Sequence, residues 1–150
     1  MTVRIGVLGL GSVLYGPYLS LIERLRREGR VEVTAIYDPD PGKRAAVGRR
    51  LDLDPALADE RAVIEHDAVD LVLVLTSMLE HGRLTRAALA AGHHVLVEKP
   101  VATSLEEAET VLAEAAEAPG LLMCAPHILL SPTYREIHRR VRTGGIGDLL

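Results

Sequence analysis

Short apolar runs recur along the chain, and each is followed by a segment whose apolar residues have helical spacing. Five such runs are expected to form strands, at residues 3–9, 31–37, 70–75, 94–98 and 121–124. Apolar runs of this length are typical of buried strands. Because strands that alternate with helices form right-handed βαβ units, we predict one parallel sheet with helices on both faces, which is a doubly wound α/β fold.

The segments between these runs carry the signals that begin and end helices. Gly29 and Gly92 each follow a helical pattern as C-cap residues. Gly16 and Pro17 precede the first helix, and because proline favours a first helical turn, we expect that helix to begin late, near Tyr18. The helices are expected at residues 18–27, 43–51, 81–91, 104–118 and 132–143.

The composition agrees with such a fold and argues against nucleic-acid binding. The chain has 150 residues, enough for one domain with a buried core, and the absence of Phe and Trp predicts an aliphatic core. Its 17 basic and 21 acidic residues are interspersed and give a net charge of −4. A nucleic-acid-binding protein would instead show a clustered basic face.

Cysteine usage and hydropathy indicate the compartment. Cys124 is the only cysteine, which rules out a disulfide within the chain and fits a reducing compartment. We expect it to be a buried structural thiol. No apolar stretch approaches the roughly 20 residues of a membrane span, and no signal peptide is recognised. We therefore expect a cytoplasmic protein without a membrane partner.

The first candidate site is a glycine pair after the first expected strand. Gly9 permits a tight turn, and Gly11 lets the backbone approach a pyrophosphate at the start of the next helix, which is the physical basis of the dinucleotide-binding fingerprint. Leu14 occupies the third fingerprint position instead of glycine or alanine. A tight turn without a ligand is the simpler alternative. The residues expected to contact a cofactor here are Gly9, Gly11, Ser12 and Val13.

The second candidate is Asp38, directly after the second expected strand. A carboxylate at this position can accept hydrogen bonds from both hydroxyls of an adenosine ribose and repels a 2′-phosphate, so it favours NAD over NADP. Lys43 and Arg44 lie close by in the sequence, and either could reach a phosphate. Because aspartate is also common in turns, an ordinary turn at residues 38–41 is the alternative.

Small polar residues follow the third expected strand. Thr76, Ser77 and Met78 form the expected loop, and His81 begins the next helix. Because the carboxyl ends of parallel strands meet at one edge of the sheet, these groups can line the path of the nicotinamide half of a cofactor. For His81 the alternative is an early-helix residue without a role in a site, whereas His127, after the fifth strand, falls on the same edge. No histidine or cysteine cluster has the spacing of metal ligands, so we predict no metal site.

The fourth candidate is Glu98-Lys99-Pro100, at the end of the fourth expected strand. Proline cannot continue the ladder of a central strand, so both charges are left at the ligand-binding edge. An ammonium group there could donate a hydrogen bond to a substrate hydroxyl or carbonyl, or exchange a proton with it. Taken alone, such a pair is most often a solvated strand end. The three other candidates on the same edge favour a site.

Together these motifs resemble the glucose–fructose oxidoreductase and inositol dehydrogenase family (Gfo/Idh/MocA). The shared order is a glycine loop, an acid after the second strand, Thr-x-x-x-x-His after the third and Glu-Lys-Pro after the fourth. Residues 87–100 are very similar to the signature of the family. The resemblance continues through Ser131-Pro132 and Gly145-Ile146-Gly147, and it covers nearly the whole chain.

The resemblance implies a Rossmann domain that binds NAD, with NADP as the alternative, and hydride transfer at a sugar or polyol carbon. It implies that the catalytic residue is Lys99, which contacts the substrate hydroxyl and assists proton transfer. Glu98 and Pro100 would place this lysine, and a cis Lys99–Pro100 bond is expected, as in some related folds. The full set of expected cofactor-binding residues is Gly9, Gly11, Ser12, Val13, Asp38, Thr76, Ser77, Met78, His81, Glu98, Lys99, Pro100 and His127.

The chain departs from the family pattern in two places and in length. Ser77-Met78 stands where Pro-Asn is usual, and His127-Ile128 stands where Asn-Arg is common, so both changes concern the nicotinamide and substrate side. Family members carry a second α/β domain that supplies substrate-binding residues and the oligomer interface. We therefore expect a dinucleotide-binding domain at residues 1–125, and a crossover helix with the start of a truncated C-terminal domain at residues 126–150. The full-length form is expected to be a homo-oligomer with a small sugar or polyol-like substrate.

Two other functions are compatible with the residues alone. A non-catalytic dinucleotide-binding or sensing module would use the same glycine loop, and it would keep its function when Lys99 is replaced by alanine. A methyltransferase can have a similar loop and acid, but Glu-Lys-Pro has no role in that chemistry.

Overall fold

The computed structural model describes residues 1–53, 59–125 and 130–147. These residues contain one parallel sheet of five strands in the order β2-β1-β3-β4-β5. Each strand lies within one residue of its expected bounds at either end. The strands are β1 (Val3–Leu8), β2 (Val31–Tyr37), β3 (Leu71–Val74), β4 (His94–Val97) and β5 (Leu122–Cys124).

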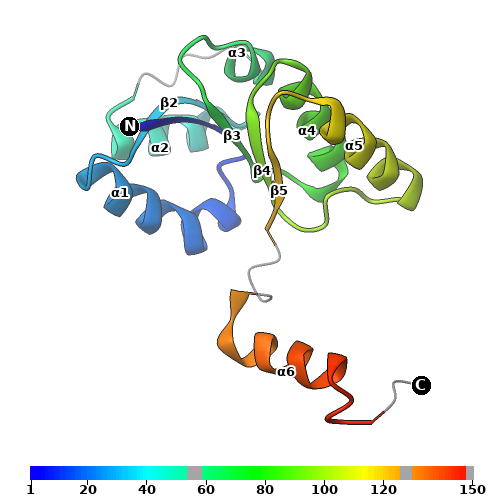
Figure 1. The fold of residues 1–150 in the computed structure, drawn as a ribbon. Helices are drawn as coiled ribbons and strands as arrows, with labels where there is room; N and C mark the ends of the chain where they lie inside the picture. Colours follow the sequence, from blue (N-terminus) through cyan, green and yellow to red (C-terminus); the bar gives the residue numbers. More distant parts are fainter. Residues whose placement is uncertain (54–58, 126–129, 148–150) are drawn as a thin grey trace.

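Helices cover both faces of the sheet, which confirms the doubly wound α/β prediction. They are α1 (Leu19–Arg27), α2 (Pro41–Leu51), α3 (Glu60–Ile64), α4 (His81–Ala90), α5 (Leu105–Glu117) and α6 (Pro132–Arg142). Figure 1 shows α1 and α2 on one side of the sheet and α4 and α5 on the other, while α6 lies apart. None of the described helices is long and apolar enough to cross a membrane.

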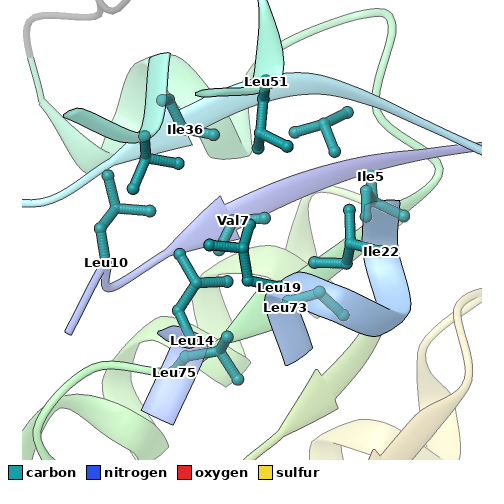
Figure 2. Close-up of a cluster of buried hydrophobic side chains, with 12 residues drawn as sticks. Ile5, Val7, Leu10, Leu14, Leu19, Ile22, Ile36, Leu51, Leu73 and Leu75 are labelled. Atoms are coloured by element: carbon teal, nitrogen blue, oxygen red, sulfur yellow. The ribbon is translucent and has the colours of Figure 1, made fainter. Parts of the chain in front are cut away.

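The core is aliphatic and consists of two layers, one on each face of the sheet. Because side chains of a strand alternate between faces, Val7 of β1 packs against α1 and α2, whereas its neighbour Leu8 packs on the side of α3 and α4. Figure 2 shows the first layer, in which Leu14 and Leu19 of the first helical segment lie against β1 and β3. Both layers leave the carboxyl ends of the strands uncovered for the loops.

The strand order places a crevice at one end of the sheet. After β1 the chain crosses to β2 on one side, and after β2 it returns past β1 to β3 on the other. The loops that leave β1 and β3 therefore diverge, and ligands of open α/β sheets bind at such a point. Residues 9–11 and 75–77 form these two loops.

The start of the first helical segment differs from the expectation. Ser12 and Val13 are already helical, and a π-helical turn, η1 (Leu14–Tyr18), leads into α1. Pro17 has no N–H, and its ring would collide with the carbonyl four residues earlier in an α-helix. The wider π turn accommodates it, because the N–H of Leu19 bonds to the oxygen of Leu14 five residues earlier. The α-helix α1 therefore begins within one residue of its expected start, but the helical turns from Ser12 to Tyr18 that precede it were not predicted.

The remaining differences are small. Helix α3 was not expected, because five residues are too few to show helical periodicity. A short 3₁₀ turn, η2 (Met78–Glu80), occupies the end of the expected loop after β3. Gly29 and Gly92 have positive φ angles, 67° and 89°, and end α1 and α4 as predicted.

Candidate functional site

Gly9 is required by both its conformation and its surroundings. Its φ angle is +92°, and a Cβ atom at this position would lie 2.6 Å from the carbonyl carbon and oxygen of Leu75 and from the nitrogen of Thr76. Its N–H donates to the carbonyl of Tyr37 at 2.8 Å. The turn after β1 is thus held directly between the ends of β2 and β3.

Gly11 differs from Gly9 in what surrounds it. Apart from its neighbours in the chain, no atom of the described residues lies within 4 Å of a Cβ built on Gly11, and its φ angle is not in the left-handed region. Ser12 and Val13, which begin the helix, are exposed. Because the first N–H groups of a helix have no acceptor within the helix, this open corner offers donors to an anion.

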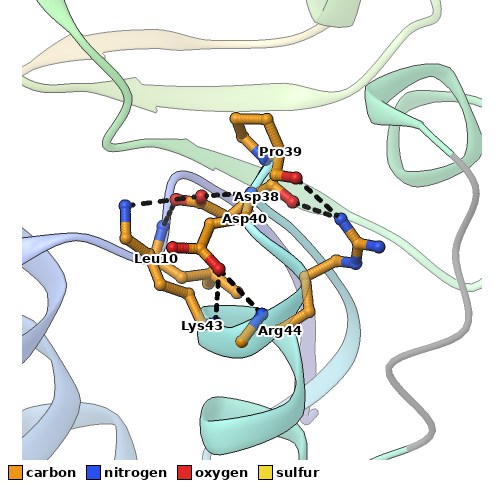
Figure 3. A network of polar contacts seen from close by, with 7 residues as sticks. Leu10, Asp38, Pro39, Asp40, Lys43 and Arg44 are labelled. Carbon is orange, nitrogen blue, oxygen red and sulfur yellow. Dashed lines mark hydrogen bonds and ion pairs between the residues drawn. The ribbon is translucent and has the colours of Figure 1, made fainter.

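Asp38 organises the loop after β2, as Figure 3 shows. Its carboxylate accepts from the N–H of Leu10 at 2.9 Å and from the N–H of Asp40 at 3.0 Å, and the Lys43 ammonium lies 3.5 Å from Oδ1. Asp38 is 5% exposed. The residue therefore forms the ordinary turn considered above and also ties the glycine loop to β2. Since each carboxylate oxygen has two lone pairs, the capacity to accept a ligand hydroxyl is retained.

The two basic residues of α2 that follow have different surroundings. The Arg44 guanidinium donates to the carbonyls of Asp38 at 2.7 Å and Pro39 at 3.3 Å, and it lies 5.5 Å from the ring centroid of Tyr37. The Lys43 side chain is about half exposed, and in the described parts of the chain the only polar partner of its ammonium is the Asp38 carboxylate. Of the two cations, Lys43 is therefore the one that faces the loop.

His81 connects two loops that both follow strands. It is 2% exposed, with Nδ1 2.7 Å from the carbonyl oxygen of Pro100 and Nε2 3.2 Å from the carbonyl oxygen of Thr76. A neutral imidazole has a single N–H, whereas the imidazolium ion has two. Whichever form is present, the ring lies between the loop after β3 and the turn after β4. Ser77 and Met78 in the first of these loops are exposed.

The turn after β4 separates its two charged side chains. Glu98 is 8% exposed; its Oε1 accepts from the Tyr18 hydroxyl at 2.8 Å and its Oε2 from the Lys99 N–H at 3.1 Å. The Lys99–Pro100 bond is cis, as predicted. Lys99 itself is exposed, and within the described residues its ammonium has no hydrogen bond or ion pair. Its amine is therefore accessible to a substrate.

A cleft of about 390 Å³ lies where the loops after β1, β2 and β3 meet. Its walls include three residues that the sequence did not single out as a site, Pro39, Leu75 and Glu80. They also include Lys43, which the sequence placed near a phosphate. The predicted residues that the cleft brings together are Gly9, Gly11, Ser12, Val13, Asp38, Thr76 and Ser77. Met78, His81, Glu98, Lys99 and Pro100 lie outside its lining, and His127 lies outside the described residues.

A second hollow of about 290 Å³ adjoins this cleft and shares Gly9, Pro39, Thr76 and Glu80 with it. It extends toward the other face of the sheet between Tyr37 and Leu84, and its walls are mostly apolar. Arg83, paired with Glu60 and Glu80, stands at its side. The two hollows together make an elongated groove across the point where the strand order reverses.

Sequence reasoning missed the residues that depend on exact packing. Pro39 and Leu75 directly adjoin predicted residues, and Glu80 lies between Thr76 and His81, so neighbouring positions were the available signal. Tyr18 gave no signal except the unusual Gly16-Pro17 pair before it. In the described parts of the chain, no group of three or more His, Cys, Asp or Glu side chains could hold a metal ion.

Comparisons with known proteins agree with this geometry. Residues 3–125 match the model of an oxidoreductase family with an NAD-binding Rossmann fold. The scyllo-inositol 2-dehydrogenase (NAD(+)) of Bacillus subtilis is 28% identical, over 97% of this chain and 42% of that enzyme. Inositol 2-dehydrogenase 3 of Saccharopolyspora erythraea is 34% identical, over 100% of this chain and 44% of that enzyme. A 3-ketoreductase from Actinomadura kijaniata, solved with NADP, has a TM-score of 0.82 and 32% identity over 99% of this chain and 46% of its own. The chain thus spans less than half the length of these relatives.

Proposed function

The chain belongs to the Gfo/Idh/MocA oxidoreductase family, whose NAD-binding Rossmann fold it shares, and we propose that it binds NAD or NADP for hydride transfer at a sugar or polyol hydroxyl carbon. The observation that carries the proposal is the groove at the ends of β1, β2 and β3, which has open space beside Gly11 and buried Asp38 at its side. A nicotinamide cofactor supplies or accepts the hydride in such a reaction.

The groove suits a dinucleotide in shape and in the polarity of its walls. The space beside Gly11, with the N–H groups that begin the helix, would receive the pyrophosphate. The apolar hollow between Tyr37 and Leu84 would receive the flat adenine base. On the opposite side, Thr76 and Ser77 would line the path toward the nicotinamide, with His81 holding the carbonyl of Thr76 from behind.

The choice between NAD and NADP is expected to depend on Asp38 and Lys43. Asp38 would accept hydrogen bonds from the ribose hydroxyls and repel a 2′-phosphate. Lys43 offsets that repulsion, because its ammonium lies 3.5 Å from the Asp38 carboxylate and is half exposed. We therefore propose that NAD is preferred and that NADP binds more weakly. Among the relatives, an inositol dehydrogenase named for NAD(+) and another named for NADP(+) both occur.

Lys99 is proposed as the catalytic residue. Oxidation of an alcohol to a carbonyl releases the hydroxyl proton, which a neutral amine can accept, and reduction requires an ammonium that returns it. Lys99 suits this role because it is exposed beside the sheet edge and its ammonium is not engaged by Glu98, whose carboxylate faces Tyr18 instead. Glu98 and Pro100 fix the backbone that carries the amine.

Cofactor binding is tested directly with this chain. NADH and NADPH are titrated separately, and binding is followed by the fluorescence of the reduced nicotinamide and by calorimetry. We expect saturable binding of both, with the smaller dissociation constant for NADH. If neither binds at millimolar concentration, the proposed function is wrong.

Turnover is tested in the protein as its gene encodes it. Inositols and simple sugars are offered with NAD⁺ or NADP⁺, and the formation of reduced cofactor is followed by absorbance. Replacing Lys99 with alanine should reduce kcat by about 10²–10⁴, the usual contribution of a general acid–base group, while leaving NADH affinity nearly unchanged. A Lys99→Ala variant with the wild-type kcat would refute the catalytic role of Lys99, whereas a wild-type protein that binds NADH without any turnover would favour the non-catalytic dinucleotide-binding module.

A further inference from the structure

Among the described residues, Tyr18 is the one side chain whose hydrogen bond joins the helix after the glycine loop to the turn after β4. Its hydroxyl donates to Oε1 of Glu98 at 2.8 Å, across 80 residues of sequence. Burial and this hydrogen bond raise the pKa of Tyr18, so the hydroxyl stays protonated and remains a donor at physiological pH. The Tyr18 hydroxyl is therefore available as a donor to Glu98.

Glu98 is a buried carboxylate that relies on neutral donors. It is 8% exposed, and no described Lys, Arg or His side chain forms an ion pair with it. Since burying a charge is costly unless hydrogen bonds compensate it, the two donors that reach Glu98 strongly determine its position. One is the Tyr18 hydroxyl, and the other is the backbone N–H of Lys99. The side chain before Lys99 thus holds the backbone of Lys99.

The π turn explains why Tyr18 reaches Glu98. Leu14 and Leu19 are five positions apart and would be separated by about 140° around a regular α-helix, yet each is 1% exposed in the same core layer. The π turn, which contains Pro17, brings both onto the sheet. Tyr18, at the end of this turn, is then directed toward the ends of β4 and β5. There the thiol of Cys124 has its pKa raised by burial and by the charge of Glu98.

We propose that Tyr18 is a positioning residue that fixes the backbone of Lys99 through the carboxylate of Glu98. The importance of this role for catalysis rests on the proposed function of Lys99, but the positioning itself does not. The pair couples the segment that would receive the pyrophosphate to the segment that would meet the nicotinamide and the substrate. The unusual Gly16-Pro17 sequence, which the site did not otherwise explain, acquires a role as the origin of the turn that directs Tyr18.

The test compares Tyr18→Phe with Tyr15→Phe in this chain. Tyr15 lies on the same π turn and is exposed, and its hydroxyl has no hydrogen-bond partner in the described residues. The first measurement is amide hydrogen exchange by NMR at Lys99, with Val95 as the reference. The N–H of Val95 bonds to Leu121 near the other end of β4 and should report only general loosening of the sheet.

We expect Tyr18→Phe to accelerate exchange of the Lys99 amide about five-fold or more, because it removes a hydrogen bond to a charged carboxylate, which is stronger than a neutral one. Exchange at Val95 should not change, and Tyr15→Phe should change neither amide. Equal rates in wild type and Tyr18→Phe would overturn the proposal, as would equal acceleration at Lys99 and Val95. As a second variant, Glu98→Leu should accelerate exchange at Lys99 by itself, and adding Tyr18→Phe to it should have no further effect. A further acceleration in the double variant would show that Tyr18 does not act through Glu98.

A second measurement separates this inference from the proposed function. Affinities are determined for NADH and for ADP-ribose, which lacks the nicotinamide. Tyr18→Phe should weaken NADH binding about five-fold and leave ADP-ribose binding unchanged, whereas equal weakening of both would argue against a role at the Lys99 turn. If the wild-type chain binds neither compound but the exchange results hold, the proposed function is refuted and the positioning role of Tyr18 stands.

Discussion

Gly9 and Gly11 provide a matched pair of substitutions that separates folding from ligand binding. In Gly9→Ala the new Cβ atom would lie 2.6 Å from three backbone atoms of the loop after β3, at a φ angle of +92°. A left-handed conformation costs a non-glycine residue about 1–2 kcal/mol. Forcing a methyl group into a packed site costs about 1–3 kcal/mol more. We therefore expect the free energy of unfolding to fall by about 2–5 kcal/mol.

Gly11→Ala should have the opposite profile. Its Cβ atom meets no protein atom within 4 Å and its φ angle is not left-handed. Replacing such a glycine reduces the entropy of the unfolded chain, which stabilises a protein by about 0.4–1 kcal/mol. The methyl group would project into the space proposed for the pyrophosphate, so NADH affinity should fall at least ten-fold.

The assay is urea unfolding followed by circular dichroism for both variants, together with NADH titration of Gly11→Ala. The slope of the unfolding free energy with urea should match the wild type, which shows that the same surface is exposed on unfolding. A Gly9→Ala variant within 1 kcal/mol of the wild type would refute the close approach of the two loops. A Gly11→Ala variant with wild-type NADH affinity would refute the placement of the pyrophosphate.

Three further predictions concern single side chains. Thr85→Val should raise the free energy of unfolding by about 1 kcal/mol in urea titrations, because the Thr85 hydroxyl is fully buried without a hydrogen-bond partner in the described residues; a lower stability would contradict this. Arg4 lowers the pKa of Asp70 to about 2, so their contact contributes stability above the unfolded pKa near 4, and that contribution is lost as pH falls from about 4 to 2. Asp70→Asn should therefore flatten the pH dependence of the melting temperature in this window, and an unchanged slope would count against the pair. Lys43→Glu should weaken NADPH binding at least ten-fold more than NADH binding in parallel titrations. Equal weakening of both would show that Lys43 is remote from the 2′ position.

Most of the fold was predictable because its signals are local. Apolar runs bounded by glycine, proline or charged residues identified each strand to within one residue. A strand that is buried on both faces needs apolar side chains at nearly every position, so it stands out in the sequence. Gly9 was also identified correctly, because a tight turn between a strand and the following helix needs a residue without a Cβ atom. Pro100 marked the end of β4 through its missing N–H.

The contacts within the site could not be predicted, because they depend on side-chain directions set by packing. The sequence presented Glu98 and Lys99 as a charged pair, whereas the turn sends the carboxylate toward Tyr18 and leaves the amine exposed. His81 was expected to face a cofactor, and its two ring nitrogens lie against backbone carbonyls. Pro17 was interpreted as the start of a helix, because a π turn has no sequence pattern distinct from that of an α-helix.

The position of β1 in the sheet has a consequence for the order in which the protein opens. β1 is the first strand along the chain, yet it pairs with both β2 and β3. Within the described residues the edge strands β2 and β5 each pair with one neighbour, but β2 pairs with β1 over six residues, whereas β5 pairs with β4 over three. Local opening should therefore begin at β5 and reach β1 last. Gly9 and Asp38 are attached to the strands that open late, and Lys99 follows β4, which loses a neighbour as soon as β5 detaches. The half of the groove that would hold the adenosine and phosphates is thus attached to the strands that open last. The half that would perform the chemistry is attached to a strand that opens earlier.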